Sequence, residues 1–259
     1  MMMSVQDLGR QGYQAFGIPV SGALDPVSLR VANALVGNPE GMGALEFRMV
    51  GPKLRVAAES VRVALAGTAA PIEILEPARM TVPGGRSIRL QHDQVFRVGT
   101  ISDSACCYLS VEGGFDLPPV FGSQSTYAKG GFGGFEGRYV RGGDRLPLLL
   151  SRTSTNCDRQ IDADLSTGND GAIRVVLGPQ KEHFTEEGIE TFLTGEFTVS
   201  ADADRMGIRL EGPIVEHARG FNITSDGIVN GSIQVPGSGQ PIVLLADRQT
   251  TGDTRKSAR

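Results

Sequence analysis

Three short clusters of polar side chains in this sequence of 259 residues are of the types that could do chemistry. In the last cluster, the apolar run Ile242–Ala246 leads directly into Asp247, Arg248 and Gln249. Arginine can grip a carboxylate with two N–H groups, aspartate can orient or deprotonate an amide N–H, and glutamine can donate to and accept from an amide. Because a buried strand that ends in such side chains often presents a substrate site, this cluster predicts binding of a small polar substrate.

We expect Asp247 and Arg248 to be catalytic. On a regular strand these neighbours would point in opposite directions, so a bend at the strand end is needed to bring both into one pocket. The remaining candidates, drawn from all three clusters, are expected to bind the substrate: Gln249, Gln234, Arg205, Arg10 and Asp7. The alternative is that these charges form structural Asp–Arg pairs at strand ends, and spacing alone weighs the two interpretations about equally.

Neither a metal motif nor a phosphate-loop motif occurs in the sequence. The histidines are far apart, Cys106 and Cys107 are adjacent and Cys157 stands alone, so neither a zinc site nor a disulfide framework is indicated. The glycine cluster Gly130–Gly134 follows Lys129 and precedes no Gly-Lys-Ser/Thr sequence, which favours a lid or a sharp bend. Any ATP would then bind by another device or on another chain.

The elements that must position these side chains are mostly short strands. Residues 1–150 alternate apolar runs with glycine and proline turns, which favours strands joined by hairpins. The expected strands are Val61–Gly67, Ile72–Leu75, Ser87–Leu90, Val95–Val98 and Cys107–Val111. In the first of them Val61, Val63 and Leu65 alternate with other residues, as in a half-buried strand.

One helix is expected in each half of the chain. In the first half, Asp25 can cap a helix that begins at Pro26 and stops at Gly37. The apolar residues expected on its buried face are Val27, Val31, Ala34 and Leu35. In the second half, Thr185–Thr194 has acidic residues in its first turn and Gly195 after its end.

A polar stretch, residues 151–172, indicates a linker or long surface loop between an N-terminal half, 1–150, and a C-terminal half, 173–259. Strands in the C-terminal half are expected at Ile173–Leu177, Glu196–Val199, Gly207–Leu210 and Ile242–Ala246. The sequence therefore predicts a mostly β (α+β) protein with barrel or sandwich halves and about one helix in each half.

Composition excludes several classes of function. Glycine and proline make up about 19% of the chain against roughly 12% on average, which fits many tight turns. The net charge of −4 argues against a nucleic-acid groove as the main site. No apolar run is long enough to span a membrane and no secretory signal begins the chain, so a soluble, cytoplasmic protein is expected.

The clusters also occur in motifs that closely resemble one known family along nearly the whole chain. The matching motifs are Gln6–Arg10, Ile18–Asp25, Ala32–Asn38, Gly113–Asp116, Gly122–Thr126, Asp204–Pro213, Gly231–Pro236 and Ala246–Thr251. The family is the biotin-dependent carboxyltransferase subunit, also called allophanate hydrolase subunit 2, which includes the C-type subunit of bacterial ATP-dependent 5-oxoprolinase.

The resemblance implies a cyclophilin-like fold that contains a β-barrel. It implies a subunit of an ATP-dependent 5-oxoprolinase complex, which opens the lactam of 5-oxoproline to glutamate. The implied partners are a homologue of the B-type 5-oxoprolinase subunit, also called allophanate hydrolase subunit 1, and a lactamase-like third subunit. Two alternatives follow from relatives: a biotin-dependent carboxyltransferase acting on urea or a related amide, and a non-catalytic antagonist of a kinase inhibitor.

Both ends of the sequence depart from the family pattern. Only Met1–Val5 precede the Gln-Asp-Leu-Gly-Arg motif, and Gly252 is followed by Asp253–Arg259, a polar tail without strand character. The C-terminal half is therefore expected to be truncated and to leave an open sheet edge, which makes activity of the isolated chain doubtful.

Overall fold

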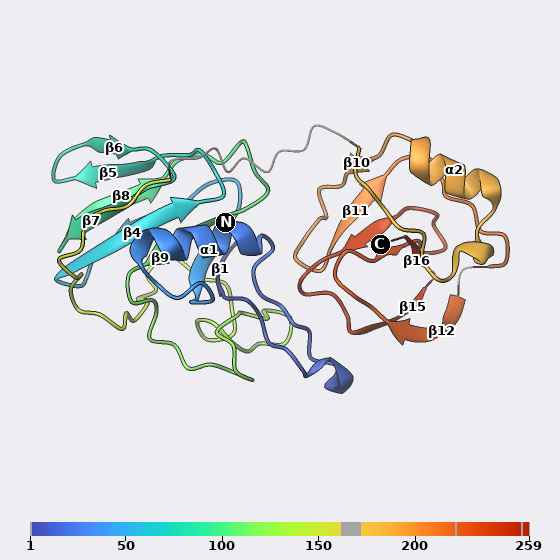
Figure 1. Cartoon of the computed structure of the whole chain (residues 1–259), viewed down its shortest axis with the longest axis horizontal. Coiled ribbons are helices and arrows are strands. Elements are labelled where there is room, and N and C mark those ends of the chain that lie inside the picture. The colour runs from blue at the N-terminus through green and yellow to red at the C-terminus, as the bar shows by residue number, and fades with distance from the viewer. Residues whose placement is uncertain (1, 162–171, 221, 255, 259) are drawn as a thin grey trace. The chain divides into compact units, whose positions relative to one another are not determined.

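The computed structural model describes residues 2–161, 172–220, 222–254 and 256–258. The chain divides into two compact units (Figure 1). Unit 1 comprises Met1–Arg10 and Ser21–Thr167, and unit 2 comprises Gln11–Val20 and Gly168–Arg259. Ten residues near the N-terminus thus belong with the C-terminal unit.

Unit 1 contains nine strands and one α-helix among the described residues, several of them at the positions that the apolar runs predict. In chain order they are β1 (Met3–Gln6), α1 (Pro26–Val36), β2 (Ala44–Phe47), β3 (Lys53–Arg55), β4 (Ser60–Ala66), β5 (Ile72–Glu76), β6 (Met80–Val82), β7 (Ser87–Gln91), β8 (Val95–Val98) and β9 (Cys107–Val111).

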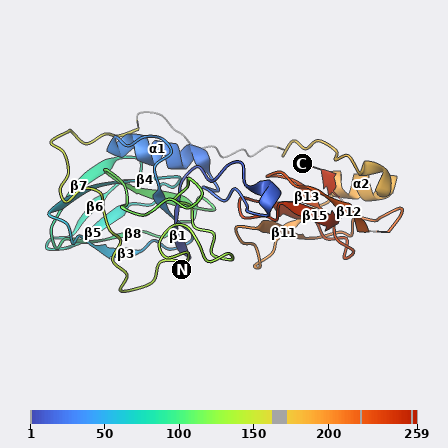
Figure 2. The same ribbon diagram turned by 90° about the horizontal axis from the view of Figure 1, so that it is seen from below.

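The strands of unit 1 form two antiparallel sheets, ordered β1-β2-β9-β4-β7 and β3-β8-β5-β6. Figure 2 shows α1 on one side of β4 and the strands β3, β5 and β8 on the other. The two end strands of each sheet are not paired with each other in the described part of the chain, so neither sheet closes into a barrel.

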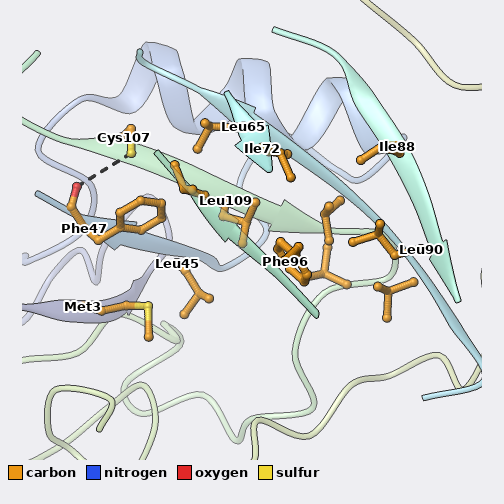
Figure 3. Close-up of a cluster of buried hydrophobic side chains, with 14 of the residues drawn as sticks. Met3, Leu45, Phe47, Leu65, Ile72, Ile88, Leu90, Phe96, Cys107 and Leu109 are labelled. Atoms are coloured by element: carbon orange, nitrogen blue, oxygen red, sulfur yellow. Dashed lines mark hydrogen bonds between the residues drawn. The ribbon is translucent and has the colours of Figure 1, made fainter. Parts of the chain in front are cut away.

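Strand β4 is buried on both faces, whereas the sequence predicted a half-buried strand. Val63 and Leu65 point into the large apolar core between the two sheets, part of which Figure 3 shows. The opposite face carries Ala64 and Ala66, whose small side chains let α1 pack closely. Alternate residues of β4 thus face two different apolar layers, and neither face of the strand is turned to solvent.

Helix α1 begins and ends where its capping residues predict. The Asp25 carboxylate accepts from the backbone N–H groups of Val27 and Ser28, and Gly37 ends the helix in the left-handed conformation, with φ of 80°. The expected buried face is only half right: Leu35 is buried and Val31 packs against the core, but Val27 and Ala34 are exposed. The residues that are buried are Leu29, Ala32, Asn33, Leu35 and Val36.

The buried face also includes the polar Asn33. Its amide donates to the carbonyl oxygens of Glu40 and Met42 and accepts from the hydroxyl of Ser110, so it is buried with its hydrogen bonds satisfied. A pattern that counts only apolar residues does not place this position on the buried face.

Unit 2 is built from shorter elements, seen at the right of Figure 1. They are two 3₁₀ turns, Gln14–Phe16 and Lys181–His183, the helix α2 (Glu186–Thr194), and the strands β10 (Thr198–Val199), β11 (Gly207–Glu211), β12 (Asn222–Gly227), β13 (Ile233–Gln234), β14 (Ile242–Leu244), β15 (Thr251–Thr254) and β16 (Lys256–Ala258). One sheet has the order β10-β11-β14-β13-β16, and β12 pairs with β15. With α1, helix α2 confirms a mostly β fold with one α-helix in each unit of the described chain.

Two strand assignments from the sequence are wrong. Ile173–Leu177 forms no strand and has only a single bridge position, at Leu177, while Ile173 and Val176 are 86% and 69% exposed. Conversely, the tail expected to lack strand character contributes to β15 and forms β16, which pair with β12 and β13. Strand formation depends on finding a partner for backbone N–H and C=O groups, which an apolar pattern does not report.

None of the described helices is long and apolar enough to cross a membrane.

Candidate functional site

A cavity of about 160 Å³ lies within unit 2. Its lining combines charged, amide and apolar side chains: Asp204, Met206, Gly207, Arg209, Ile228, Gln234, Ile242, Leu244, Arg248 and Gln249. Three of the candidate site residues, Gln234, Arg248 and Gln249, are therefore brought to one cavity. Its volume is well below the roughly 300–1,000 Å³ of pockets for drug-sized ligands, so it suits a small metabolite.

One face of the three central strands of the five-stranded sheet forms much of this lining. In the register of β11, β14 and β13, Arg209 lies opposite Ile242, which in turn lies opposite Gln234. Gly207 lies opposite Leu244, two residues further along each strand. Since side chains two residues apart share a face of a sheet, all five residues face the same side.

A turn at the end of β14 separates the two residues expected to act together. The backbone N–H of Arg248 donates to the carbonyl oxygen of Leu245, which closes a tight turn after the strand. Arg248 then lines the cavity, whereas Asp247 pairs with Arg205, and neither member of that pair is part of the lining. The bend that the sequence requires is present, but after it the side chain of Arg248 lies at the cavity and the side chain of Asp247 lies against Arg205.

The pair of Arg205 and Asp247 is a buried, two-pronged salt bridge. Arg205 Nε donates to Asp247 Oδ2 at 2.9 Å, and Nη2 donates to Oδ1 at 3.2 Å. The backbone N–H of Asp247 also donates to the carbonyl oxygen of Arg205. The pair thus ties the chain before β11 to the chain after β14, and this tie fixes the turn from which Arg248 extends.

Arg248 is buried, with 8% of its surface exposed. Its Nε donates to the carbonyl oxygen of Ile228 and its Nη1 to that of Leu245, each at 3.3 Å. Among the described residues no carboxylate forms an ion pair with it. Burial lowers the pKa of the Arg248 guanidinium, because removal from water disfavours its charged form.

Asp204 contributes a negative charge to the lining and is held by local bonds. Its Oδ1 accepts from the backbone N–H groups of Met206 and Gly207, at 2.7 and 3.2 Å. A methyl group added at Gly252 would lie 2.5 Å from Cδ1 of Ile228 and 2.8 Å from Nε2 of Gln234, so glycine at this position leaves both side chains their present room.

The other two candidates, Asp7 and Arg10, belong to unit 1 and to a network within that unit. Asp7 accepts from the hydroxyls of Ser123 and Ser125 and from the backbone N–H groups of Gly9 and Gln124. Its two oxygens therefore already have four donors, which makes the carboxylate a clamp between the N-terminal segment and residues 123–125.

Arg10 joins the same region to the glycine cluster. Its Nη2 donates to the carbonyl oxygen of Ser125, and its guanidinium lies 5.0 Å from the centre of the Phe132 ring. Gly133 and Gly134 have positive φ values, and a side chain on either would clash with Ser125 or Thr126. These contacts describe a sharp bend packed against its neighbours.

Several cavity residues were not among the candidates that the sequence produced, including Arg209, Ile228 and Leu244. A period-two pattern along residues 207–211 could have identified Arg209 as sharing a face with Gly207. The contribution of Ile228 depends on long-range contacts and has no local signal.

Cysteines and histidines stand apart from this cavity. Cys106 and Cys107 are buried in unit 1, and Cys157 is exposed. His217 contacts the carbonyl oxygen of Val235 through Nε2 at 3.1 Å. In the part of the chain that the structure describes, no three His, Cys, Asp or Glu side chains are grouped to hold a metal ion.

Comparison with known proteins gives a consistent result. Residues 16–258 match the model of a family described as carboxyltransferase domain, subdomains A and B. The chain is 37% identical to the C-type subunit of 5-oxoprolinase from Escherichia coli strain K12, over 97% of this chain and 79% of that protein.

Solved structures share the fold across nearly the whole chain. The crystal structure of TTHA0988 has a TM-score of 0.85 and 32% identity, and the match covers 100% of this chain and 49% of that one. The K. lactis urea amidolyase has a TM-score of 0.86 and 31% identity, over 99% of this chain and 17% of that protein. This chain thus spans about half of the first structure and a smaller part of the second.

Proposed function

Because the chain belongs to the family of carboxyltransferase domains with subdomains A and B, we propose that it is a subunit of an ATP-dependent 5-oxoprolinase complex. The complex would add water across the lactam C–N bond of 5-oxoproline, so that the carbonyl carbon becomes a carboxylate and the nitrogen an amine, giving glutamate. The C-type 5-oxoprolinase relative, matched over most of both chains, supports this assignment.

The observation that carries the proposal is the cavity of unit 2, which is lined by two amide side chains and a buried arginine. A lactam offers one N–H donor and one C=O acceptor. Gln234 and Gln249 can each supply the complementary acceptor and donor, while Arg248 can hold an anionic group of the substrate. Hydrogen bonds that strengthen as the carbonyl oxygen gains negative charge would lower the barrier to attack on the carbon.

The roles of the remaining candidates follow from where they lie. We assign Asp247 and Arg205 to positioning Arg248 through their salt bridge, with no direct contact to the cavity. Asp7 and Arg10, expected from the sequence to bind substrate, are assigned to holding the N-terminal segment of unit 1.

Partners and cofactors belong to the same proposal. A homologue of the B-type subunit and a lactamase-like subunit would complete the complex, and ATP would bind with a partner, in keeping with a glycine cluster that is a packed bend. We also propose a cytoplasmic location and, for each unit, an opened variant of the cyclophilin-like barrel.

A second function is favoured by the similarity to K. lactis urea amidolyase. The chain would then be part of a biotin-dependent carboxyltransferase that moves CO₂ from carboxybiotin to urea or a related amide. The same amide-lined cavity would hold the acceptor nitrogen.

Reconstitution separates the two functions. The full protein is mixed with its B-type and lactamase-like partners, and glutamate formed from 5-oxoproline and ATP is measured. In parallel, the protein is assayed with a biotin-carrier protein, biotin carboxylase, bicarbonate and urea. Glutamate formation that needs this chain supports the first function, carboxylation of urea supports the second, and activity in neither assay contradicts both.

A further inference from the structure

Arg248 is a buried cation without an anionic partner among the described residues. A guanidinium has five N–H donors, and the carbonyl oxygens of Ile228 and Leu245 accept one each from Nε and Nη1. Its Nη2 has no acceptor in the part of the chain that the structure describes. Because buried charges in proteins are usually paired, an arginine in this state is a candidate for pairing with a ligand.

The two backbone contacts also orient the side chain. Both acceptors are carbonyl oxygens, one of them in the turn that follows β14 and the other on residue 228. Held at Nε and Nη1, the guanidinium is fixed before any ligand arrives, and its Nη2 is left available to a ligand in the cavity that Arg248 lines. An orientation of this kind reduces the entropy lost on binding.

From this geometry we infer that Arg248 is the residue that recognises a carboxylate on the substrate, and thus selects a small amide that carries a carboxylate over a neutral amide such as urea. The inference depends on the proposed function only in taking the substrate to be an amide. The carboxylate subsite follows from Arg248 itself.

Two features favour a monoanionic carboxylate over a phosphate group. Asp204 lines the same cavity and would repel a dianion more strongly than a monoanion. The volume of about 160 Å³ also suits a molecule of the size of a five-membered ring with one carboxylate. Gln234 and Gln249 are then left for the lactam N–H and C=O groups.

The test measures binding of three probes to the full chain by calorimetry: 5-oxoproline, which has lactam and carboxylate, cyclopentanecarboxylate, which has only the carboxylate, and 2-pyrrolidinone, which has only the lactam. Arg248→Gln should weaken both carboxylates about 10- to 100-fold and leave 2-pyrrolidinone unchanged, as expected for loss of a charge-assisted contact. Arg248→Lys should recover part of the affinity. Arg219→Gln removes an exposed positive charge of the same unit and should change none of the three.

The outcomes distinguish this inference from the proposed function. The carboxylate subsite is overturned if the two carboxylates bind Arg248→Gln as tightly as they bind the unchanged protein. It is also overturned if they do not bind the unchanged protein at all. Either result holds even if the complex opens 5-oxoproline. Cyclopentanecarboxylate binding that depends on Arg248 upholds the subsite even if no lactam is opened. In an active complex, Arg248→Gln should raise KM for 5-oxoproline in a folded protein, and an unchanged KM would also overturn the inference.

Discussion

The buried salt bridge between Arg205 and Asp247 is the residue-scale feature on which the geometry of the site depends. Both side chains are nearly inaccessible to water, and their two hydrogen bonds join the segment before β11 to the segment after β14. A pair of this kind contributes little net stability over apolar residues of similar size, but breaking it leaves an uncompensated buried charge. Its importance here is that it fixes the direction in which Arg248 leaves the turn.

Arg205→Ala should therefore destabilise the protein by about 3–5 kcal/mol, whereas the double change Arg205→Met with Asp247→Leu should cost much less. Urea unfolding followed by circular dichroism measures both. If Arg205→Ala is as stable as the double variant, removal of Arg205 does not leave Asp247 as an uncompensated buried charge, and the prediction is wrong.

A second charge pair predicts a pH effect in unit 1. Hydrogen bonds from Arg138 and from the backbone N–H of Arg141 lower the pKa of Asp144 from 3.8 to about 2. Because the pKa in the folded state lies below that of the unfolded chain, the stabilisation is present above pH of about 4 and is lost as the pH falls toward 2. A carboxyl-carbon NMR titration should place the Asp144 midpoint near 2. In Arg138→Gln the midpoint should rise, and an unchanged midpoint would rule out Arg138 as the main cause.

At the scale of elements, the sequence predicts those features whose causes are local. Asp25, Pro26 and Gly37 mark the ends of α1 correctly because capping bonds and the left-handed stop involve residues a few positions apart. Ile173–Leu177 has the composition of a strand and forms none, since a strand needs a partner that its own sequence does not specify.

The candidate site follows the same rule. Gln234, Arg248 and Gln249 could be placed near one another because they lie in or just after short apolar runs. The pairing of Asp247 with Arg205, 42 residues away, depends on the antiparallel register of β11 and β14 and on a turn, so the sequence could only leave the structural and the functional interpretations open.

The glycine-rich bend in unit 1 allows an element-scale test with an internal control. Gly131 and Gly133 have similar positive φ values, of 69° and 74°. A methyl group at Gly131 would meet open space, whereas at Gly133 it would meet the carbonyl oxygen of Ser125. Gly131→Ala should cost about 1–2 kcal/mol for the left-handed backbone alone, and Gly133→Ala clearly more.

Thermal unfolding of the two variants, side by side, measures the difference. Equal losses of stability would mean that residues 130–134 can move away from Ser125. The cluster would then act as a lid, the alternative that the sequence left open.

At the scale of the whole molecule, the two units differ in how much apolar surface they bury. The main core of unit 1 extends from Met3 to Val140 across two sheets. The main cluster of unit 2 contains the buried residues Phe184, Val215 and Val235. Unit 2 also leaves Ile173, Val176 and Ile214 largely exposed. Since burial of apolar surface is the main source of stability, we expect the unit that holds the candidate site to be the less stable one.

Unit 2 should therefore open before unit 1 and should be the unit that a substrate stabilises. In hydrogen exchange followed by mass spectrometry, the strands β11 and β14 should exchange faster than β4 and β9, because they close a smaller core. A ligand that binds only the folded unit at 100 times its Kd stabilises that unit by about 2.7 kcal/mol, so saturating 5-oxoproline should slow exchange in β11 and β14 by up to roughly 100-fold. Exchange in β4 and β9 should stay the same, which provides the control within one experiment. Protection that appears in unit 1 instead, with unit 2 unchanged, would place the substrate site outside the cavity formed by Gln234, Arg248 and Gln249 and would contradict the assignment of that cavity to the substrate.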